Sequence, residues 1–167
     1  LSPILAVSNE ENWSYLKREG DPISVQLAGW PTVDESTQDP ELEAKWERIF
    51  KVREVVSKAL EEARRSKIIG HSLSASVHLL ADSPWLEDLR SVPDLDKIFI
   101  VSAVSLEPGE PQESGYVSLE EVPGIWVKVQ QASGSKCERC WVYSPTVGED
   151  ETHPTLCSRC LEVVTRL

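Results

Sequence analysis

Residues 136–160 carry the most informative stretch of this chain, KCERCWVYSPTVGEDETHPTLCSRC. It holds all four cysteines of the 167-residue sequence, in the pairs Cys137/Cys140 and Cys157/Cys160 with sixteen residues between them. A C-x2-C pair repeated after such an interval is typical of tetrahedral zinc sites, because each short turn aims two thiolates at one point. We therefore expect one structural Zn²⁺ ion, held by these four cysteines.

The cysteine pattern has alternatives to a structural zinc site with four sulfur ligands. Disulfides are disfavoured, because the chain shows no secretory features. A thioredoxin-like redox motif needs one C-x-x-C at a helix start, and two matched pairs do not fit it. His153 is a minor candidate for replacing one sulfur, although its place before Pro154 indicates a turn. Catalytic zinc is disfavoured, since four thiolates leave no open coordination position.

Two residues of the first pair are candidates for a functional contact. Arg139 stands between two ligands in a tight turn, so we expect its side chain to project outwards. Trp141 follows the last ligand of that turn directly. A guanidinium beside an indole is suited to holding an unstacked base and its phosphate. The competing interpretation is that Trp141 covers the zinc core and Arg139 is merely solvated.

The charge of the chain is unevenly distributed. The net charge is −11, yet residues 45–67 hold eight of the 17 basic residues and only four acidic ones. Because the local field steers a polyanion more than the total charge does, a basic helix on an acidic body is compatible with RNA. A solvated helix face with i,i+4 ion pairs explains the same pattern.

The basic segment is predicted to be a long amphipathic helix. Asp39-Pro40-Glu41 supplies an N-cap acceptor, a proline at the first helical position and an acid in the first turn. Apolar residues then recur at three- and four-residue steps for about seven turns. Gly70 is the expected C′ residue. The apolar positions are Trp46, Ile49, Val52, Val56, Ala59, Leu60 and Ala63.

Shorter elements are expected on both sides of this helix. Residues 9–18 predict a short helix and residues 24–28 a short strand. After the long helix we expect a strand over 73–79, a helix over 83–89, a central strand over 98–104 and a strand over 125–129. A loop should span 107–115, and residues 132–135 should form a hinge. The fold class is α+β, with a long helix, a small mixed αβ layer and a C-terminal knuckle.

The chain resembles isoleucyl-tRNA synthetases of the bacterial and organellar type. The most specific likeness is Lys136-Cys137-Glu138-Arg139-Cys140-Trp141, with 147–148, 153–154 and 156–160 beyond it. The long helix and its exit are similar as well, at Trp46, 52–53, Val56, 58–61, 63–64, Lys67 and 69–73. Residues 24–27 and 30–31 fit the segment before that helix.

The resemblance implies binding to the anticodon end of tRNA(Ile) beside the catalytic and editing domains of the same polypeptide. The knuckle would present Arg139 and Trp141 to the anticodon loop. Position 142 is Val, where the family pattern leads us to expect a polar residue, so no polar contact is carried over from it. The implied RNA-contact candidates, with Lys136 included, are Lys136, Arg139, Trp141, Arg48, Lys51, Lys58, Arg64, Arg65 and Lys67. Arg53 lies near the apolar stripe and is expected to be paired within the core.

The chain lacks the two signatures with which the family binds ATP and the adenylate. Residues 68–71, Ile-Ile-Gly-His, match part of one signature by chance, because they close a helix instead of opening one. We therefore expect a piece of isoleucine–tRNA ligase that is not catalytic alone. The absence of methionine likewise leads us to expect a fragment or a processed chain.

The resulting organisation has three parts. Residues 1–71 form part of the helical anticodon-binding domain, residues 72–131 a small αβ extension and residues 132–167 the zinc knuckle. We expect a monomer with no membrane association, in the bacterial cytoplasm or alternatively in a chloroplast or mitochondrion. The alternative functions are a zinc-ribbon module that binds protein without any role in catalysis or RNA binding, and a redox or metal sensor.

Overall fold

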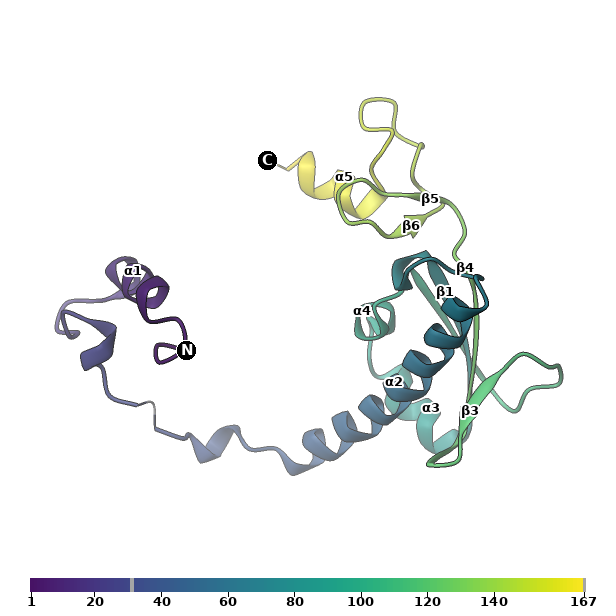
Figure 1. The fold of residues 1–167 in the computed structure, drawn as a ribbon, viewed down its shortest axis with the longest axis horizontal. Helices are drawn as coiled ribbons and strands as arrows, with labels where there is room; N and C mark the ends of the chain where they lie inside the picture. Colours follow the sequence, from purple (N-terminus) through teal and green to yellow (C-terminus); the bar gives the residue numbers. More distant parts are fainter. Residues whose placement is uncertain (31, 167) are drawn as a thin grey trace. The chain divides into compact units, whose positions relative to one another are not determined.

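The computed structural model describes residues 1–30 and 32–166, and the chain divides into two compact units, Leu1–Asp39 and Pro40–Leu167. The elements are a mixture of helices and strands, so the predicted α+β class is confirmed (Figure 1). None of the described helices has the length and apolar character needed to cross a membrane. The predicted division at 71/72 and 131/132 stays a prediction.

The first unit is small and its helices bury no residue. Helix α1 spans Ala6–Leu16, somewhat earlier than the predicted 9–18, and two 3₁₀ turns follow at Val25–Leu27 and Glu35–Thr37. The strand predicted over 24–28 is wrong. The Ser24 side chain accepts a hydrogen bond from the Gln26 N–H and starts a 3₁₀ turn there, as serine caps do. Pro31, which belongs to the resemblance, lies outside the described residues.

Helix α2 spans Pro40–Arg65 and begins as predicted, with Pro40 at its first position and acids in the first turn. Its end was predicted wrongly, because Lys67 and not Gly70 takes the left-handed conformation, with φ 58°. The Ile68 N–H donates to the Ala63 carbonyl at 2.9 Å and the Lys67 N–H to the Arg64 carbonyl at 3.1 Å. This pair of bonds is a Schellman motif, which closes the helix three residues earlier.

The second unit is built on a four-stranded sheet in the order β2-β1-β4-β3. Strand β1 pairs in parallel with β2 and antiparallel with β4, and β3 pairs antiparallel with β4. Two short helices join the parallel strands. The bounds are β1 Ala75–Ala81, α3 Ser83–Arg90, α4 Leu95–Phe99, β2 Ala103–Pro108, β3 Val117–Leu119 and β4 Val122–Gln131.

The predictions for this layer were largely confirmed, with one clear error. Helix α3 and strand β4 lie where they were expected, and β1 lies two residues later. The strand predicted over 98–104 is wrong: α4 runs to Phe99, Ile100 is left-handed with φ 57°, and β2 starts at Ala103 on the sheet edge. Short apolar runs do not distinguish a buried helix from a strand.

Helices α2, α3 and α4 cover the same face of this sheet (Figure 1). The apolar stripe of α2, with Val52, Val56 and Ala59 fully or almost fully buried, packs in one core with Val77 and Val127 of the sheet. Because successive strand residues face opposite sides, the alternation in β1 places its odd-numbered residues in this core. The sheet and α2 thus share one packed core and are called the platform below. The cysteine module, the segment after β4, is attached at the end of this platform.

The module follows β4 directly and contains β5 Ser135–Lys136, β6 Tyr143–Ser144 and α5 Ser158–Val164. It is tied to the platform by hydrogen bonds. The Ser102 hydroxyl accepts from the Tyr143 N–H at 2.8 Å and donates to the Leu73 carbonyl, and the Ala132 N–H donates to the Ser74 carbonyl. Residues 132–135, which were predicted to form a hinge, therefore begin at a residue that is hydrogen-bonded to the platform, Ala132.

Gly134 offers a test of this attachment. It has φ +84°, and a Cβ atom there would lie 2.2 Å from the Ser144 carbonyl carbon. Gly109 is the matched control, with φ +115° and nothing within 4 Å of a Cβ. At either position an alanine would have to adopt a positive φ, which costs about 1–2 kcal/mol. We expect Gly134→Ala to lower the free energy of unfolding by a further ~1–3 kcal/mol through overpacking, measured by urea denaturation. Equal effects of the two substitutions would contradict the close approach.

Candidate metal centre

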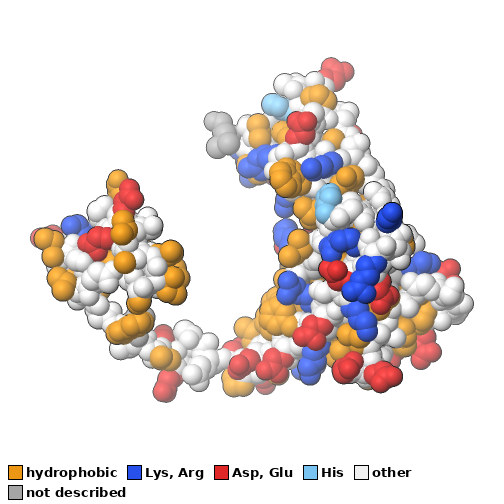
Figure 2. All heavy atoms as spheres, viewed as in Figure 1, with side chains coloured by type: hydrophobic (Ala, Val, Ile, Leu, Met, Phe, Trp, Pro, Cys, Tyr) orange, Lys and Arg blue, Asp and Glu red, His pale blue; other side chains and the backbone are white. Residues whose placement is uncertain are grey.

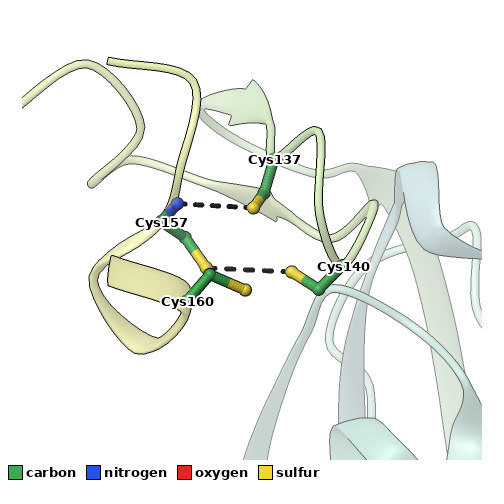
Figure 3. Close-up of side chains that lie close together, drawn as sticks. All are labelled: Cys137, Cys140, Cys157 and Cys160. Atoms are coloured by element: carbon green, nitrogen blue, oxygen red, sulfur yellow. Dashed lines mark hydrogen bonds between the residues drawn. The ribbon is translucent and has the colours of Figure 1, made fainter. Parts of the chain in front are cut away.

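The four cysteine sulfurs lie together. The sulfurs of Cys137, Cys140, Cys157 and Cys160 all lie within 4.8 Å of one another. Three of the four residues are buried and Cys140 is partly exposed. Figure 3 shows their side chains pointing toward a common centre from two separate segments. No other residue type joins this group, so His153, the minor candidate for a ligand, is not part of the cluster in the described chain.

Each pair is held by local structure. Cys137 and Cys140 lie in the turn between β5 and β6, where the Trp141 N–H donates to the Cys137 carbonyl and the Cys137 N–H to the Val142 carbonyl. Cys157 is the N-cap residue of α5 and Cys160 lies in its first turn. The spacing of two residues inside each pair suits both a tight turn and one turn of helix.

The separation of the sulfurs fits a metal and not a disulfide. The Cys140 and Cys157 sulfurs are 3.7 Å apart, whereas a disulfide bond measures about 2.0 Å. A tetrahedron with Zn–S bonds of about 2.3 Å has edges of about 3.8 Å. The four sulfurs can therefore hold one Zn²⁺ ion with little movement.

The environment differs between the two segments. Burial raises the pKa of the Cys157 thiol to about 12, which outweighs a backbone hydrogen bond from Cys160. Burial acts in the same direction on Cys137, but backbone hydrogen bonds from Cys140, Cys157 and Arg139 outweigh it and lower its pKa to about 6. One of these donors, the Cys157 N–H, lies 3.4 Å from the Cys137 sulfur. N–H groups aimed at sulfur stabilise a thiolate, the form that binds zinc.

Arg139 is exposed, in line with its predicted outward direction, but one of its nitrogens also contacts the cysteine cluster. Its Nη1 lies 3.6 Å from the Cys160 sulfur, because the other cysteine segment folds back beside the turn. Arg159, which was not among the predicted site residues, borders the same pocket as Cys140, and interaction with the Cys140 sulfur raises the pKa of its guanidinium. The signal that identifies Arg159 is its place before the second cysteine of its pair, the same place that Arg139 occupies.

Trp141 is the most exposed large hydrophobic residue in the described part of the knuckle. It is 59% exposed and its backbone is left-handed, with φ 67°. Such a conformation is costly for a bulky residue and, where it occurs, is often part of a functional site. The Lys136 Nζ lies 4.6 Å from the centre of the Trp141 ring, within cation–π range. The interpretation that Trp141 covers the zinc core is not compatible with this exposure.

The basic candidate residues on α2, and Lys67 just beyond its end, fall into two groups. Arg48 makes a two-pronged ion pair with Asp88 of α3, and Arg64 is paired with Glu61. Within the described part of the chain the remaining four make no ion pair and are exposed: Lys51, Lys58, Arg65 and Lys67. Arg53 donates to the Ile98 carbonyl at 3.2 Å but is exposed, so the expectation of a core position was wrong.

The exposed lysine and arginine side chains of α2 share one face of the helix, and the helix ends beside the knuckle. Lys51, Lys58 and Arg65 are seven residues apart, which places them on one side of the helix over about 21 Å. Just beyond the helix, the His71 ring lies 6.1 Å from the ring of Tyr143 in β6. Figure 2 shows basic and acidic side chains intermixed on the side of the larger unit that is in view.

Comparison with known proteins first defines the class of the metal centre. Residues 134–163 match the model of a zinc finger found in FPG and IleRS. Together with the sulfur cluster, this match confirms the predicted structural zinc.

The relatives define the chain more closely. It is 52% identical over 167 residues to the isoleucine–tRNA ligase of Syntrophomonas wolfei, covering 100% of this chain and 18% of that protein. It is 53% identical to the isoleucine–tRNA ligase of Moorella thermoacetica (98% and 18%) and 45% identical to that of Caldanaerobacter subterraneus (96% and 17%). The chain thus spans less than a fifth of the length of these relatives. The predicted resemblance to isoleucyl-tRNA synthetases is confirmed along the whole chain.

Substitution of one cysteine tests the metal centre. In Cys140→Ser the weaker hydroxyl ligand should lower the zinc content, measured by atomic emission of the purified protein, from one ion per chain to a small fraction. Because metal binding and folding are coupled in small zinc modules, the signals of residues 135–164 in a nuclear magnetic resonance spectrum should lose dispersion. Ser133→Ala, on an exposed residue outside the cluster, is the control and should keep one zinc. Full zinc occupancy in Cys140→Ser would contradict the four-sulfur site.

Proposed function

We propose that this chain is the tRNA-binding C-terminal part of an isoleucine–tRNA ligase and positions the anticodon end of tRNA(Ile). Cys137, Cys140, Cys157 and Cys160 ligate one structural zinc ion in this proposal. The observation that carries it is Trp141, held outward by a strained backbone next to the zinc ligands. An indole ring fixed in this way is a stacking platform for an unpaired base.

The physical basis is the rigidity of the knuckle. A side chain stacked on a base is worth about 1–3 kcal/mol, and the gain is largest when no conformational freedom is lost on binding. The turn that carries Trp141 is closed by two backbone hydrogen bonds, and the sulfur of Cys140, directly before Trp141, lies 3.7 Å from the Cys157 sulfur. Lys136 lies against the ring and brings a positive charge for a nearby phosphate.

Arg139 keeps a role in this proposal. Only one of its nitrogens faces the Cys160 sulfur, and the residue is exposed. A guanidinium has five N–H donors in a fixed planar arrangement, so the remaining ones are available to RNA. Lys51, Lys58, Arg65 and Lys67 extend the basic surface along α2 as phosphate contacts. Arg48 and Arg64 contribute less, because each is already paired with a carboxylate.

The role of the chain is positioning, and chemistry belongs to the remainder of the polypeptide. The parent is an ATP-dependent ligase whose catalytic and editing domains join isoleucine to the tRNA, while this part holds the far end of the substrate. It acts as a monomer in the bacterial cytoplasm. The names of the relatives support this division, as does the lack of the two signatures for ATP and the adenylate in the chain.

Removal of the Trp141 ring tests the proposal. Trp141→Ala should weaken binding of tRNA(Ile) by roughly 5- to 150-fold, since about 1–3 kcal/mol of stacking is lost, while the zinc content stays at one. Trp141→Phe should recover most of the affinity. Binding is measured by filter retention at several salt concentrations, and the affinity of the unsubstituted chain should fall as salt rises.

Trp30→Ala provides the control, because Trp30 is a tryptophan of the first unit that is even more exposed, at 84% against 59% for Trp141. It should leave the affinity within twofold of the unsubstituted chain. If Trp141→Ala binds tRNA(Ile) as well as the control does, the knuckle is not a tRNA contact. No binding by the zinc-loaded, unsubstituted chain at low salt would instead favour the protein-interaction module.

A further inference from the structure

Two histidine–tyrosine ring pairs occur in the described part of the chain, both in the larger unit, and their surroundings differ. The His71 and Tyr143 rings are 6.1 Å apart, and the His78 and Tyr116 rings are 5.8 Å apart. The second pair lies beside a carboxylate, since the His78 Nε2 is 3.5 Å from an oxygen of Glu107. A negative charge there disfavours a polyanion. The neighbours of the first pair are basic.

On the side of the knuckle, the first pair is connected to Trp141 through Lys136. Lys136 of β5 is the cross-strand partner of Tyr143 in β6, and residues directly opposite each other have Cβ atoms about 4.5–5.5 Å apart. The Lys136 Nζ also lies 4.6 Å from the centre of the Trp141 ring. Trp141 and Tyr143 are two residues apart, so their Cα atoms lie within about 7 Å of each other. Lys136 thus adjoins both aromatic residues.

On its other side, the pair adjoins the basic end of α2. His71 follows Lys67 by four residues, and Ser72, next to His71 in the chain, accepts a hydrogen bond from the Arg64 guanidinium at 3.4 Å. Arg64 is also paired with Glu61, whereas Lys67 is exposed and makes no ion pair among the described residues. A series of aromatic and cationic groups therefore runs from the knuckle to the end of α2.

The attachment of the module does not require this ring pair. The Ser102 hydroxyl already accepts a hydrogen bond from the Tyr143 N–H at 2.8 Å, and the Ala132 N–H donates to the Ser74 carbonyl. His71 is exposed and Tyr143 is partly exposed, so both residues remain accessible to a ligand. Histidine and tyrosine are among the side chains on which unstacked RNA bases stack.

We propose that His71 and Tyr143 form a second base-stacking site, which holds a nucleotide of the same RNA loop whose other unpaired base stacks on Trp141. This inference rests on the proposed function, because the RNA is the ligand named there. Lys136, beside both sites, is the cation for the phosphates between the two nucleotides. Two stacking sites on one compact unit fix the direction of the RNA strand as well as its position.

Alanine substitutions in the zinc-loaded full chain test the second site. His71→Ala and Tyr143→Ala should each weaken binding of tRNA(Ile) by about 5- to 150-fold, the loss expected when a base loses its stacking partner. Tyr143→Phe keeps the ring and should stay within twofold of the unsubstituted chain. Binding is measured by filter retention, after zinc content and urea denaturation have established that each variant is folded. If Tyr143→Ala fails to hold zinc, His71→Ala decides, since it leaves the module unchanged.

RNA with a missing base separates contact from indirect structural effects. Each loop nucleotide of an anticodon stem-loop of tRNA(Ile) is made abasic in turn, and its binding to the variants is measured. We expect one abasic position to cancel the effect of His71→Ala and a different position to cancel that of Trp141→Ala. An effect of His71→Ala that persists with every abasic RNA would overturn the second site.

His78→Ala is the matched control, because His78 is the other histidine that faces a tyrosine ring and lies on the sheet face away from α2. Its affinity should stay within twofold of the unsubstituted chain. If His71→Ala and Tyr143→Ala match this control while Trp141→Ala is weakened, the second site alone is wrong. No binding by the unsubstituted chain, or full affinity in Trp141→Ala, would overturn the proposed function together with this inference.

Discussion

The convergence of four sulfurs on one point is the constraint on which the last part of this structure depends. The segment after β4 has almost no apolar core: its buried cluster consists of cysteines, with Val147 and Leu156 partly buried beside them. Its two strands are two residues long each, and α5 spans only Ser158–Val164. Elements of this size are not stable alone. Metal coordination therefore stabilises this segment, whereas hydrophobic burial stabilises the sheet unit.

The sheet unit is organised differently, and the cysteine module is anchored to it. Helix α2 and the mixed sheet bury a continuous apolar core, which makes a stiff support. Ser102 and Ser74 fix the module to its edge through backbone hydrogen bonds. As a result, the exposed ring of Trp141 and the basic side chains of α2 that make no ion pair belong to one compact unit. In the proposed function, this arrangement would offer both surfaces to one RNA in a fixed relation, which a flexible hinge would not provide.

The sequence predicted those features that arise from short, regular spacing. The spacing of the cysteine pairs was enough to predict the metal site, and the helical period of the apolar residues was enough to predict the core face of α2. The failures have tertiary causes. Residues 98–99 join a helix because Phe99 packs into the core from there, and α2 ends early because a Schellman motif forms with Lys67 in place of a glycine. The contact of Arg139 with Cys160 was not predicted, because Cys160 belongs to a segment twenty-one residues further along the chain.

The central claim is that a zinc-held turn presents Trp141 to the anticodon loop. It is tested most directly by nuclear magnetic resonance titration of the zinc-loaded chain with an anticodon stem-loop RNA of tRNA(Ile), in which the indole N–H signal of Trp141 is assigned through Trp141→Phe. The account predicts that this signal and the side-chain signals of Arg139 shift strongly as the RNA is added, while the indole signal of the exposed Trp30 stays in place. An RNA that binds without moving the Trp141 signal would contradict it.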